Sequence, residues 1–407
     1  MDKIFFHIDV NSAFLSWTAT KRIKDGDPRD LRLVPAVIGG DRDKRHGIVL
    51  AKSIPAKAYG IETAEPIASA LRKCPGLIVA PPDFNLYSSM SHAMFDYLYS
   101  LTPDIEPASV DEGYLYYTPI AHLYESPQAA ADTIRQEIRT RFGFTVNVGI
   151  SDCKVLAKMA SDFTKPDKTH TLFSYEIQNK MWPLPVGNLF LCGRSATATL
   201  HKLGIITIGD LAQTDLEILT SNLKSHGRTL WEFANGIDSS EIVTEFPDAK
   251  GIGNSTTVEH DVTTEEEASA ILYSLCESVS NRMHHHEVKA SLVTVEIKYA
   301  TFKSCSRQQS LPSPVETAKA LHEASVTLFR ELWNGEPIRL LGVRVTKLLN
   351  RDDPVQLSIF DCDYPSLQES ESPGFDETRS LKLENALRDI RGRFGNDSVS
   401  KGYIKKK

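Results

Sequence analysis

The sequence predicts a multidomain protein of the α+β class, and three observations support this prediction. The chain has 407 residues, more than a single hydrophobic core usually organises. Strand-like and helix-like segments are interleaved up to about residue 165 and again after residue 250, with a run of short helices between them. A polar stretch at residues 351–378, rich in Asp, Ser, Pro and Glu, is expected to be flexible.

The first domain is expected to follow the split β-α-β-β-α-β order, with one insertion after its first helix. Residues 3–10 (KIFFHIDV) have the apolar run of a buried strand, and Asn11 or Ser12 can cap the next helix, which runs to about Lys24. The later elements are a helix at 85–101, a hairpin at 106–118 with its turn near Asp111–Gly113, a helix from Pro127 to about Phe142, a strand at 145–151 and a helix at 152–164. The insertion is expected to hold short strands at 33–39 and 48–53 and a helix at 64–75.

The second half of the chain predicts a helical region, a linker and another α+β unit. Residues 189–205 (LFLCGRSATATLHKLGI) have the pattern of a tight turn followed by a helix, and residues 239–250 that of a linker. The α+β unit is expected as a strand at 252–260, a helix at 265–285, a strand at 288–300, a helix at 315–334 and a strand at 338–348. A short helical pattern follows at 379–394.

The composition is typical of a soluble globular protein, with 41% hydrophobic and 24% charged residues. No apolar run approaches the roughly 20 residues that span a bilayer, and the N-terminal stretch lacks the layout of a signal peptide, so a cytoplasmic protein without a membrane partner is expected. The six cysteines form no CxxC pair, which argues against a zinc site or a disulfide framework. The net charge of -7 is unusual for a nucleic-acid-binding protein, although a sum can hide a local basic patch.

Three carboxylates stand out against this background. Asp9 ends an apolar strand, where an unpaired charge costs several kcal/mol. Asp111 and Glu112 are adjacent near the expected hairpin turn, and in the split fold this hairpin lies beside the end of the first strand. Three hard oxygen ligands suit Mg2+, and a pair of such ions can stabilise both the attacking and the leaving oxygen of a phosphoryl transfer. Taken alone, Asp111 and Glu112 could instead form a solvated turn, and Asp9 could be a helix cap.

Several motifs resemble, in order along the chain, those of the Y-family DNA polymerases, close to the DinB branch. They are HIDVNSAF, SVDEGYL, VNVGIS followed by KVLAKMASDFTKP, and the Leu-Gly-Ile ending of 189–205. The resemblance implies error-prone translesion synthesis, in which a monomer with two magnesium ions (Mg2+) adds deoxynucleotides to the primer end of primer-template DNA. It also implies a right-hand polymerase, with a ferredoxin-like palm (1–19 and 76–165), small fingers (20–75), a helical thumb with a helix-hairpin-helix (166–238), a linker (239–250), an α+β little finger (251–350) and a flexible tail (351–407).

The resemblance also implies roles for residues around the carboxylates. Asp9 and Asp111 would each contact both metals, Glu112 the metal that activates the primer 3′-hydroxyl, and the Val10 carbonyl the other metal. Phe14 would stack under the incoming sugar and exclude a 2′-hydroxyl, although a core aromatic is the alternative. Lys165 would contact the triphosphate.

The fingers depart from the family pattern. Many relatives hold the phosphates with a Tyr and an Arg, and Ile54 and Lys57 stand at these positions. Lysine can serve as a point charge on phosphate but lacks the bidentate fork of arginine, and isoleucine cannot donate a hydrogen bond. The details of triphosphate binding are therefore expected to differ from those of such relatives.

Further resemblance implies a DNA-binding surface and a partner protein. In the thumb, Gly193 and Arg194 stand where a Gly-Ile-Gly turn would grip phosphate, with one glycine missing. In the little finger, cations expected on or beside the strands that cross the DNA are Lys298, Lys303, Arg307, Arg344 and Lys347, with a solvated face as the alternative. The segment QLSIF resembles the pentapeptide that docks bacterial polymerases on the sliding clamp, and comprises Gln356, Leu357, Ser358, Ile359 and Phe360. Its alternative is a strand packed on the little finger.

Two rival functions remain open at this point. A non-catalytic, clamp-recruited DNA-binding adaptor of the same fold would not need all three carboxylates. A nucleotide cyclase uses two carboxylates on a similar split fold, but would not need the thumb, the little finger or QLSIF. The run His284–His286 ends a predicted helix, where cationic side chains suit the dipole, and no second ligand set accompanies it.

Overall fold

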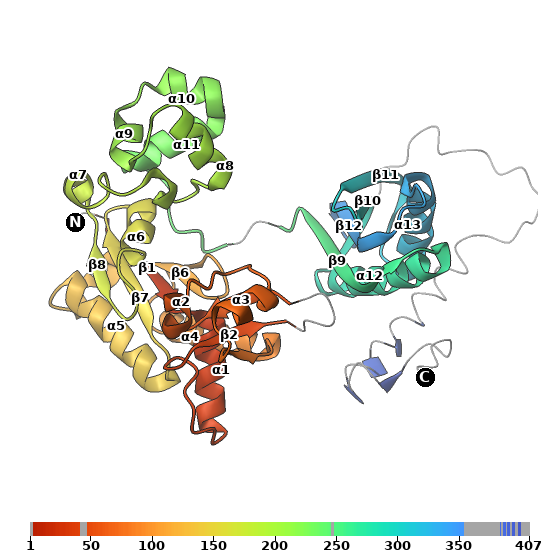
Figure 1. Cartoon of the computed structure of the whole chain (residues 1–407), viewed down its shortest axis with the longest axis horizontal. Helices are drawn as coiled ribbons and strands as arrows, with labels where there is room; N and C mark the ends of the chain where they lie inside the picture. Colours follow the sequence, from red (N-terminus) through yellow and green to blue (C-terminus); the bar gives the residue numbers. More distant parts are fainter. Residues whose placement is uncertain are drawn as a thin grey trace, which may run out of the picture. The chain divides into compact units, whose positions relative to one another are not determined.

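The computed structural model describes residues 3–40, 47–245 and 248–353, together with scattered residues between 383 and 399 (Figure 1). The described residues up to 245 form one compact unit, and those from 248 onward belong to a second. No helix among the described residues is long and apolar enough to cross a membrane.

A five-stranded mixed sheet with the order β5-β6-β1-β7-β8 forms the centre of the first unit. β1 lies in the middle and pairs antiparallel with both β6 and β7. This is the order that the split β-α-β-β-α-β pattern predicts, with β8 added at one edge. The strand bounds are β1 Phe5–Val10, β5 Ile105–Pro107, β6 Glu112–Tyr116, β7 Val146–Ser151 and β8 Thr169–Thr171.

Strand alternation gives β1 two chemically different faces. Phe6, Ile8 and Val10 join a hydrophobic core with three helices, whereas His7 and Asp9 face a single helix on the opposite side of the sheet. The three helices are α1 (Ala13–Lys24), α4 (Phe84–Tyr99) and α5 (Pro127–Phe142), and the single helix is α6 (Lys154–Ser161). The polar side chains of β1 therefore lie between the sheet and α6.

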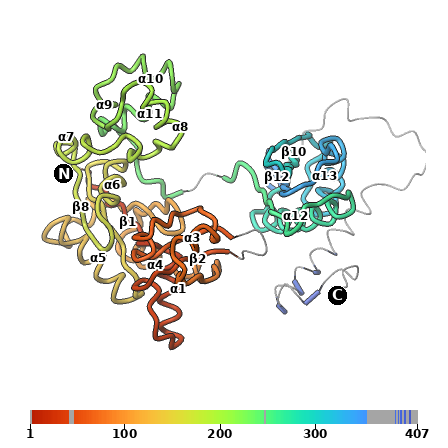
Figure 2. The backbone as a smooth tube through the Cα atoms, viewed as in Figure 1, coloured from red at the N-terminus to blue at the C-terminus, as the bar shows by residue number. Residues whose placement is uncertain are grey.

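The insertion between α1 and α4 is a small α+β subdomain, and its path can be followed in Figure 2. Its sheet has the order β3-β2-β4, with its own apolar core. Two elements here were not predicted, the short helix α2 and the strand β4. The bounds are β2 Ala36–Gly39, β3 Val49–Lys52, α2 Ile54–Ala58, α3 Ile67–Lys73 and β4 Ile78–Ala80.

Short helices follow the sheet, and most of them contribute to one further core. They are η2 Ser174–Glu176, α7 Ile177–Lys180, η3 Val186–Asn188, α8 Arg194–Lys202, α9 Ile208–Gln213, α10 Leu216–Leu223 and α11 Ser225–Ala234. The short helix η1 Thr118–Leu123 lies instead between β6 and α5, and its Ile120 joins the core of the central sheet. The start of the predicted linker lies against the first unit, because Lys154 donates to the Glu241 carbonyl at 3.1 Å and Glu106 accepts from the Val243 amide at 2.7 Å.

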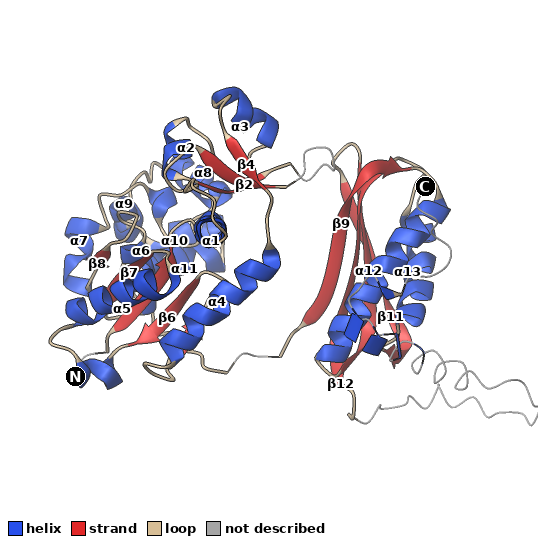
Figure 3. Ribbon diagram, turned by 90° about the horizontal axis from the view of Figure 1, so that it is seen from below, coloured by secondary structure: helices blue, strands red, loops and turns tan. Residues whose placement is uncertain are grey.

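The second unit is a four-stranded antiparallel sheet with the order β11-β10-β12-β9 and two helices on one face (Figure 3). The helices bury the apolar residues of that face, whereas the other face is polar. The bounds are β9 Gly251–Val262, α12 Glu265–His285, β10 Val288–Tyr299, β11 Ser304–Val315, α13 Ala318–Leu332 and β12 Ile338–Asn350. The sequence did not predict β11, an edge strand whose Ser, Gln and Pro residues hide the strand pattern. The described residues within 379–394 are helical, as predicted.

Two sequence-based expectations about local structure are wrong, the side-chain cap of the first helix and the position of the hairpin turn. Ser12 precedes α1 with φ 48° and makes no side-chain cap. The hairpin turn lies at residues 108–111 and not near Asp111–Gly113, since the amides of Ala108 and Ser109 both donate to the Glu112 carbonyl. Gly113 is a strand residue, and a Cβ there would lie 2.7 Å from the Phe95 ring. Close packing, and not turn conformation, therefore explains this glycine.

Candidate active site

The register of the central sheet brings two of the predicted carboxylates together. Asp9 on β1 lies directly opposite Glu112 on β6, and residues paired across an antiparallel sheet point to the same face. Asn147 on β7 lies opposite Asp9 on its other side. All three side chains therefore project toward α6.

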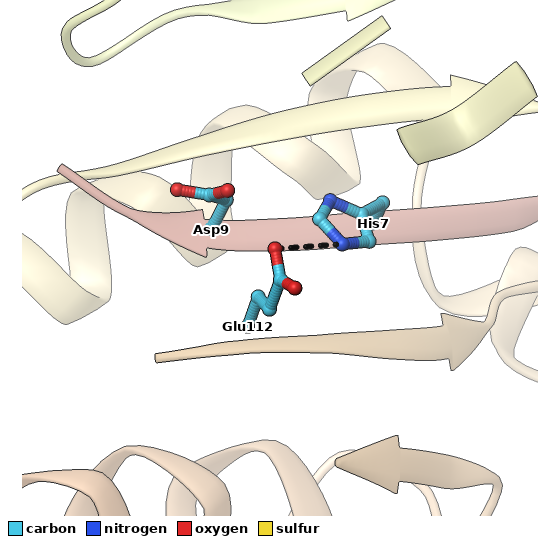
Figure 4. A group of neighbouring side chains, drawn as sticks. All are labelled: His7, Asp9 and Glu112. Atoms are coloured by element: carbon cyan, nitrogen blue, oxygen red, sulfur yellow. Dashed lines mark ion pairs between the residues drawn. The ribbon is translucent and has the colours of Figure 1, made fainter. Parts of the chain in front are cut away.

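The third carboxylate lies at the edge of this group. The Val10 amide donates to the Asp111 carbonyl at 2.9 Å, so the backbones of β1 and the hairpin remain paired there. The Ser109 hydroxyl donates to Asp111 Oδ1 at 2.7 Å. Asp111 is not part of the acidic cluster formed by Asp9, Glu112 and His7, whose ligand atoms lie within 4.8 Å of one another (Figure 4). Three carboxylates were expected to converge, and the structure brings two of them together, Asp9 and Glu112.

His7 is the unpredicted member of this cluster. It is fully buried, its Nδ1 lies 2.8 Å from Ser161 Oγ, and its Nε2 lies 3.6 Å from Glu112 Oε2. Ser161 Oγ donates to the Lys158 carbonyl, so it accepts from His7 Nδ1 and leaves Nε2 without its proton. Nε2 makes no hydrogen bond in the structure. Burial, then Lys158 and Lys165, lower the pKa of His7 well below its usual value, which keeps the ring neutral.

Two ammonium groups balance the charge of the carboxylates. Lys158 Nζ lies 2.6 Å from Glu112 Oε2 and 3.2 Å from Asp9 Oδ2, and Lys165 Nζ lies 3.0 Å from Asp9 Oδ1. Burial lowers the pKa of Lys158, but its hydrogen bond to Glu112 and the charges of Asp9 and Asp162 outweigh burial and raise that pKa. Lys158 therefore stays charged. The sequence did not assign it a role.

A buried amide network fixes the loop that carries Lys165. Asn147 Nδ2 donates to the carbonyls of Ser161 and Thr164, and its Oδ1 accepts from the Lys168 amide. Asn11 donates to Asn147 Oδ1 at 3.1 Å and accepts from the Asp167 amide at 2.9 Å. Each end of the loop is thereby tied to the central sheet.

A cavity of about 310 Å³ opens beside the carboxylates, between the start of α1 and the insertion. Lys165 and Lys57 both line it, which places two of the predicted phosphate ligands on one cavity. Lys52 and Arg32 are further lining cations that the sequence did not single out. Ile54 also lines the cavity and is 58% exposed.

Phe14 occupies the first turns of α1 but is not among the residues that line this cavity. It is partly buried, and its ring stacks on Tyr87 with centroids 4.4 Å apart and planes 8° from parallel. Tyr87 is fixed in turn by a 3.1 Å hydrogen bond with Thr18. The ring of Phe14 is thus held rigidly at the edge of the core.

The predicted thumb residues lie at the start of α8. Gly193 is the residue before the helix, and Arg194 is its exposed first residue. The amides of Cys192 and Gly193 donate to the carbonyls of Leu189 and Leu191, so they are already satisfied within the turn.

The cations predicted for the little finger are divided between the faces of the second sheet. Lys298, Glu296 and Thr294 lie on the face away from the helices, and Arg344 is paired with Thr294 on that face. Arg344 lines a cavity of about 700 Å³ there. Arg307 is instead paired with the buried Val295 and forms a 2.7 Å ion pair with Glu331 of α13. Arg307 therefore lies on the helix side of the sheet, because alternation along β11 turns it toward the helices, whereas Lys298 and Arg344 lie on the opposite face.

Two further cations and the histidine run complete the predicted set. Lys347 is exposed at an irregularity of β12 with φ 52°, and Lys303 is exposed just before β11. His284 contacts Arg351 at 3.1 Å, and within the described residues the histidine run forms no candidate metal group. The QLSIF segment, residues 356–360, lies outside the described residues.

The fold matches that of a known polymerase class. A solved Y-family DNA polymerase chimera of Dbh and Dpo4 superimposes with a TM-score of 0.75 over 85% of this chain and 99% of that chain, at 21% identity. The multidomain α+β architecture is therefore that of a Y-family polymerase.

Sequence comparison then gives the family. Profiles of the impB/mucB/samB family and of its C-terminal domain match residues 8–162 and 249–359. The chain is 42% identical to "DNA polymerase IV" of Clostridium acetobutylicum over 100% of this chain and 99% of the relative. It is 33% identical to that of Alkaliphilus oremlandii (99% of each) and 34% identical to that of Bacillus velezensis (100% and 94%). The chain belongs to the impB/mucB/samB family of Y-family polymerases, in its DNA polymerase IV branch, which confirms the resemblance.

Proposed function

We propose that this protein is a template-directed, error-prone DNA polymerase that adds deoxynucleotides to a primer 3′ end across damaged bases. The observation that carries the proposal is the pairing of Asp9 with Glu112 on one sheet face, beside a cavity lined by Lys57 and Lys165. Full-length relatives that bear the name DNA polymerase IV support the same function. Primer-template DNA and deoxynucleoside triphosphates are the corresponding partners.

The residues at the site fit a divalent cation. Asp9 and Glu112 offer hard oxygen atoms, as Mg2+ prefers, and their side chains are 13% and 27% exposed, which leaves access for water and phosphate. His7 Nε2 is buried without a hydrogen-bond partner, and two lysines form ion pairs with Asp9. Both observations indicate that the site attracts positively charged groups. We assign two Mg2+ ions to Asp9, Asp111, Glu112 and the Val10 carbonyl. Such ions would stabilise the attacking and leaving oxygens of the transfer.

The protein's own groups then divide the remaining work. Lys57 and Lys165 neutralise the triphosphate as point charges, which are less directional than a guanidinium fork. Ile54 contributes an apolar wall to the cavity and has no side-chain group that could donate a hydrogen bond to the phosphates. In this proposal Phe14, whose ring stacks on Tyr87, would limit the space beside the sugar.

The polymerase parts follow from these assignments. Residues 1–19 and 76–165 would be the palm, 20–75 the fingers, 166–238 the thumb and 251–350 the little finger. DNA phosphates would meet Gly193 and Arg194 at the start of α8, and Lys298, Lys303, Arg344 and Lys347 in the second unit. The sliding clamp would bind the QLSIF segment at 356–360.

Primer extension on undamaged and abasic templates tests the proposal. We expect the template base to dictate the inserted deoxynucleotide, and extension to continue past the abasic site. The double variant Asp111→Ala, Glu112→Ala should bind primer-template DNA without extending it. DNA binding without any synthesis by the unaltered chain would instead support the adaptor.

A further inference from the structure

Lys158 occupies the space between the two paired carboxylates. Its Nζ lies 2.6 Å from Glu112 Oε2, 3.2 Å from Asp9 Oδ2 and 3.5 Å from Asp162 Oδ2. One ammonium group thus bridges β1 and β6 at the point where their acidic residues face each other. Without it, two carboxylates on adjacent strands would repel one another across the register.

The fold holds Lys158 at this position. α6 lies directly on the sheet, because Gly149 on β7 has no side chain, and a Cβ there would lie 2.0 Å from the Ala157 carbonyl. Lys158 follows Ala157 on the same helix, and its side chain is only 12% exposed. Ser161, one turn further on, is tied to His7. The ammonium group is therefore carried by a helix that packs directly on the sheet, and its ion pairs with Glu112 and Asp9 hold it at the edge of a cavity of about 370 Å³ that Lys158 and Glu112 both line.

Lys165 differs from Lys158 in this respect. Its side chain is 36% exposed, it belongs to a loop, and it lines the cavity proposed for the triphosphate. An arriving nucleotide can draw Lys165 from Asp9 to its phosphates. Lys158 does not line that cavity, so nucleotide binding leaves its contacts with Asp9 and Glu112 in place.

We propose that Lys158 is a positioning residue that acts as a resident counter-cation: it holds Asp9 and Glu112 together without metal and weakens metal binding until nucleotide arrives. The inference rests on the proposed two-metal function. A fixed positive charge within a few ångströms of a divalent ion opposes that ion's binding. The triphosphate adds negative charge and phosphate oxygens to the site, which offsets this opposition. The metals and nucleotide therefore bind together, and the free enzyme holds metal weakly.

Binding of Mn2+ to the full chain without DNA or nucleotide, followed by electron paramagnetic resonance, tests this role. Lys158→Met removes the charge and keeps most of the stem, and we expect it to bind Mn2+ roughly tenfold more tightly or better. Lys158→Arg should restore weak binding. Lys154→Met is the matched control, because Lys154 lies one turn earlier on α6, has a similarly low side-chain exposure (9% against 12%), and pairs with Glu106 rather than with Asp9. Its Mn2+ affinity should equal that of the unaltered protein.

Two further variants make the result interpretable. Lys158→Gln provides a second neutral side chain if Lys158→Met melts below the assay temperature. A lower melting temperature without tighter Mn2+ binding in either neutral variant would overturn the proposal, because Lys158 would then only fill space. Asp9→Asn should abolish Mn2+ binding in the Lys158→Met background. Undiminished binding in that double variant would contradict the proposed metal site itself, which separates the two failures.

Discussion

At the scale of single residues, alternation along β1 decides which side chains can share one site. His7 and Asp9 are two residues apart, so both face α6, and Glu112 and Asn147 join them from the neighbouring strands. The neutral imidazole, the two carboxylates and Lys158 form one polar layer between sheet and helix. The polar side chains of β1 therefore share one face of the sheet, and its apolar side chains pack into the core on the other face.

Part of this layer could be predicted from sequence. Asp9 and Glu112 could be paired because an acidic residue ended an apolar strand and the strand order fixed its neighbour. The position of His7 two residues before Asp9 was a usable signal, as were two lysines four residues apart on the otherwise apolar helix α6. The contact of Ser109 with Asp111 depends on the turn at 108–111, and no sequence pattern specifies that geometry.

Phe14 gives a prediction about sugar selection. Phe14→Ala should retain much deoxynucleotide insertion and gain ribonucleotide insertion by orders of magnitude, because relief of a steric clash yields about tenfold for each ~1.4 kcal/mol. Single-nucleotide insertion kinetics with both sugars would measure this, together with the melting temperature. Phe14→Tyr, which keeps the ring, is the control.

The stacking of Phe14 on Tyr87 supports the alternative role, in which the ring only stabilises the core. If the ring serves only the core, Phe14→Ala should cost roughly 3–5 kcal/mol of unfolding free energy. Both insertion activities would then fall together, and the preference for deoxyribose would not change.

At the scale of elements, the approach of α6 to β7 sets the position of the polar layer. Gly149→Ala places a methyl group against the Ala157 carbonyl and the Ser161 amide, at 2.0 and 2.5 Å. Helix or strand must shift, so we expect a loss of about 1–3 kcal/mol in unfolding free energy and reduced insertion. Chemical denaturation measures the first effect.

Gly76 offers the matched control for this substitution. No atom lies within 4 Å of a Cβ at Gly76, so Gly76→Ala should leave stability and insertion nearly unchanged. Equal stability of the Gly149 and Gly76 variants would show that α6 is not held by this contact.

The two faces of the second sheet give a prediction about DNA binding. If Arg344 contacts phosphate, Arg344→Met should weaken binding to all sequences and reduce the salt slope of log affinity by about one. Arg307→Met should leave the slope unchanged, since Arg307 pairs with Glu331 on the helix side. Fluorescence anisotropy at several salt concentrations measures both, and a larger effect of Arg307 would reverse this assignment.

Element types were predicted best where periodicity was strong. The helices α5 and α12 begin at Pro127 and Glu265, as the cap residues Ser126 and Thr264 allow. The strand β11 was missed because its exposed, edge position demands no apolar alternation. Helix α2 spans only five residues, too short for a periodic signal.

At the scale of the whole molecule, the predicted clamp motif at residues 356–360 gives a prediction about a partner protein. Leu357→Ala with Phe360→Ala should abolish stimulation of synthesis by the bacterial sliding clamp and preserve basal synthesis, because exposed apolar anchors need a partner to bury them. Primer extension with and without clamp measures both.

The control for this prediction is Leu367→Ala, an apolar residue of the same polar stretch. It should respond to the clamp normally. A loss of basal synthesis in the Leu357, Phe360 variant would mean that the segment packs within the protein.

The net charge of -7 shows why whole-chain composition was a poor guide to function. Four lysines and arginines line the cavity beside Asp9, where phosphate is expected, and Lys298 and Arg344 lie on the face of the second sheet away from the helices. Acidic residues elsewhere cancel them in the sum. Only the placement of charge on the folded chain carries this information.

The most direct test of metal-dependent catalysis at the Asp9–Glu112 pair is single-nucleotide insertion at saturating primer-template DNA as a function of Mg2+ concentration. Asp9→Asn keeps the shape of the side chain, and Glu137→Gln on the surface of α5 is the matched carboxylate control. We predict that Asp9→Asn binds DNA normally but inserts no nucleotide at any Mg2+ concentration, while Glu137→Gln behaves as the unaltered protein. Insertion by Asp9→Asn at ordinary Mg2+ concentrations would contradict the assignment.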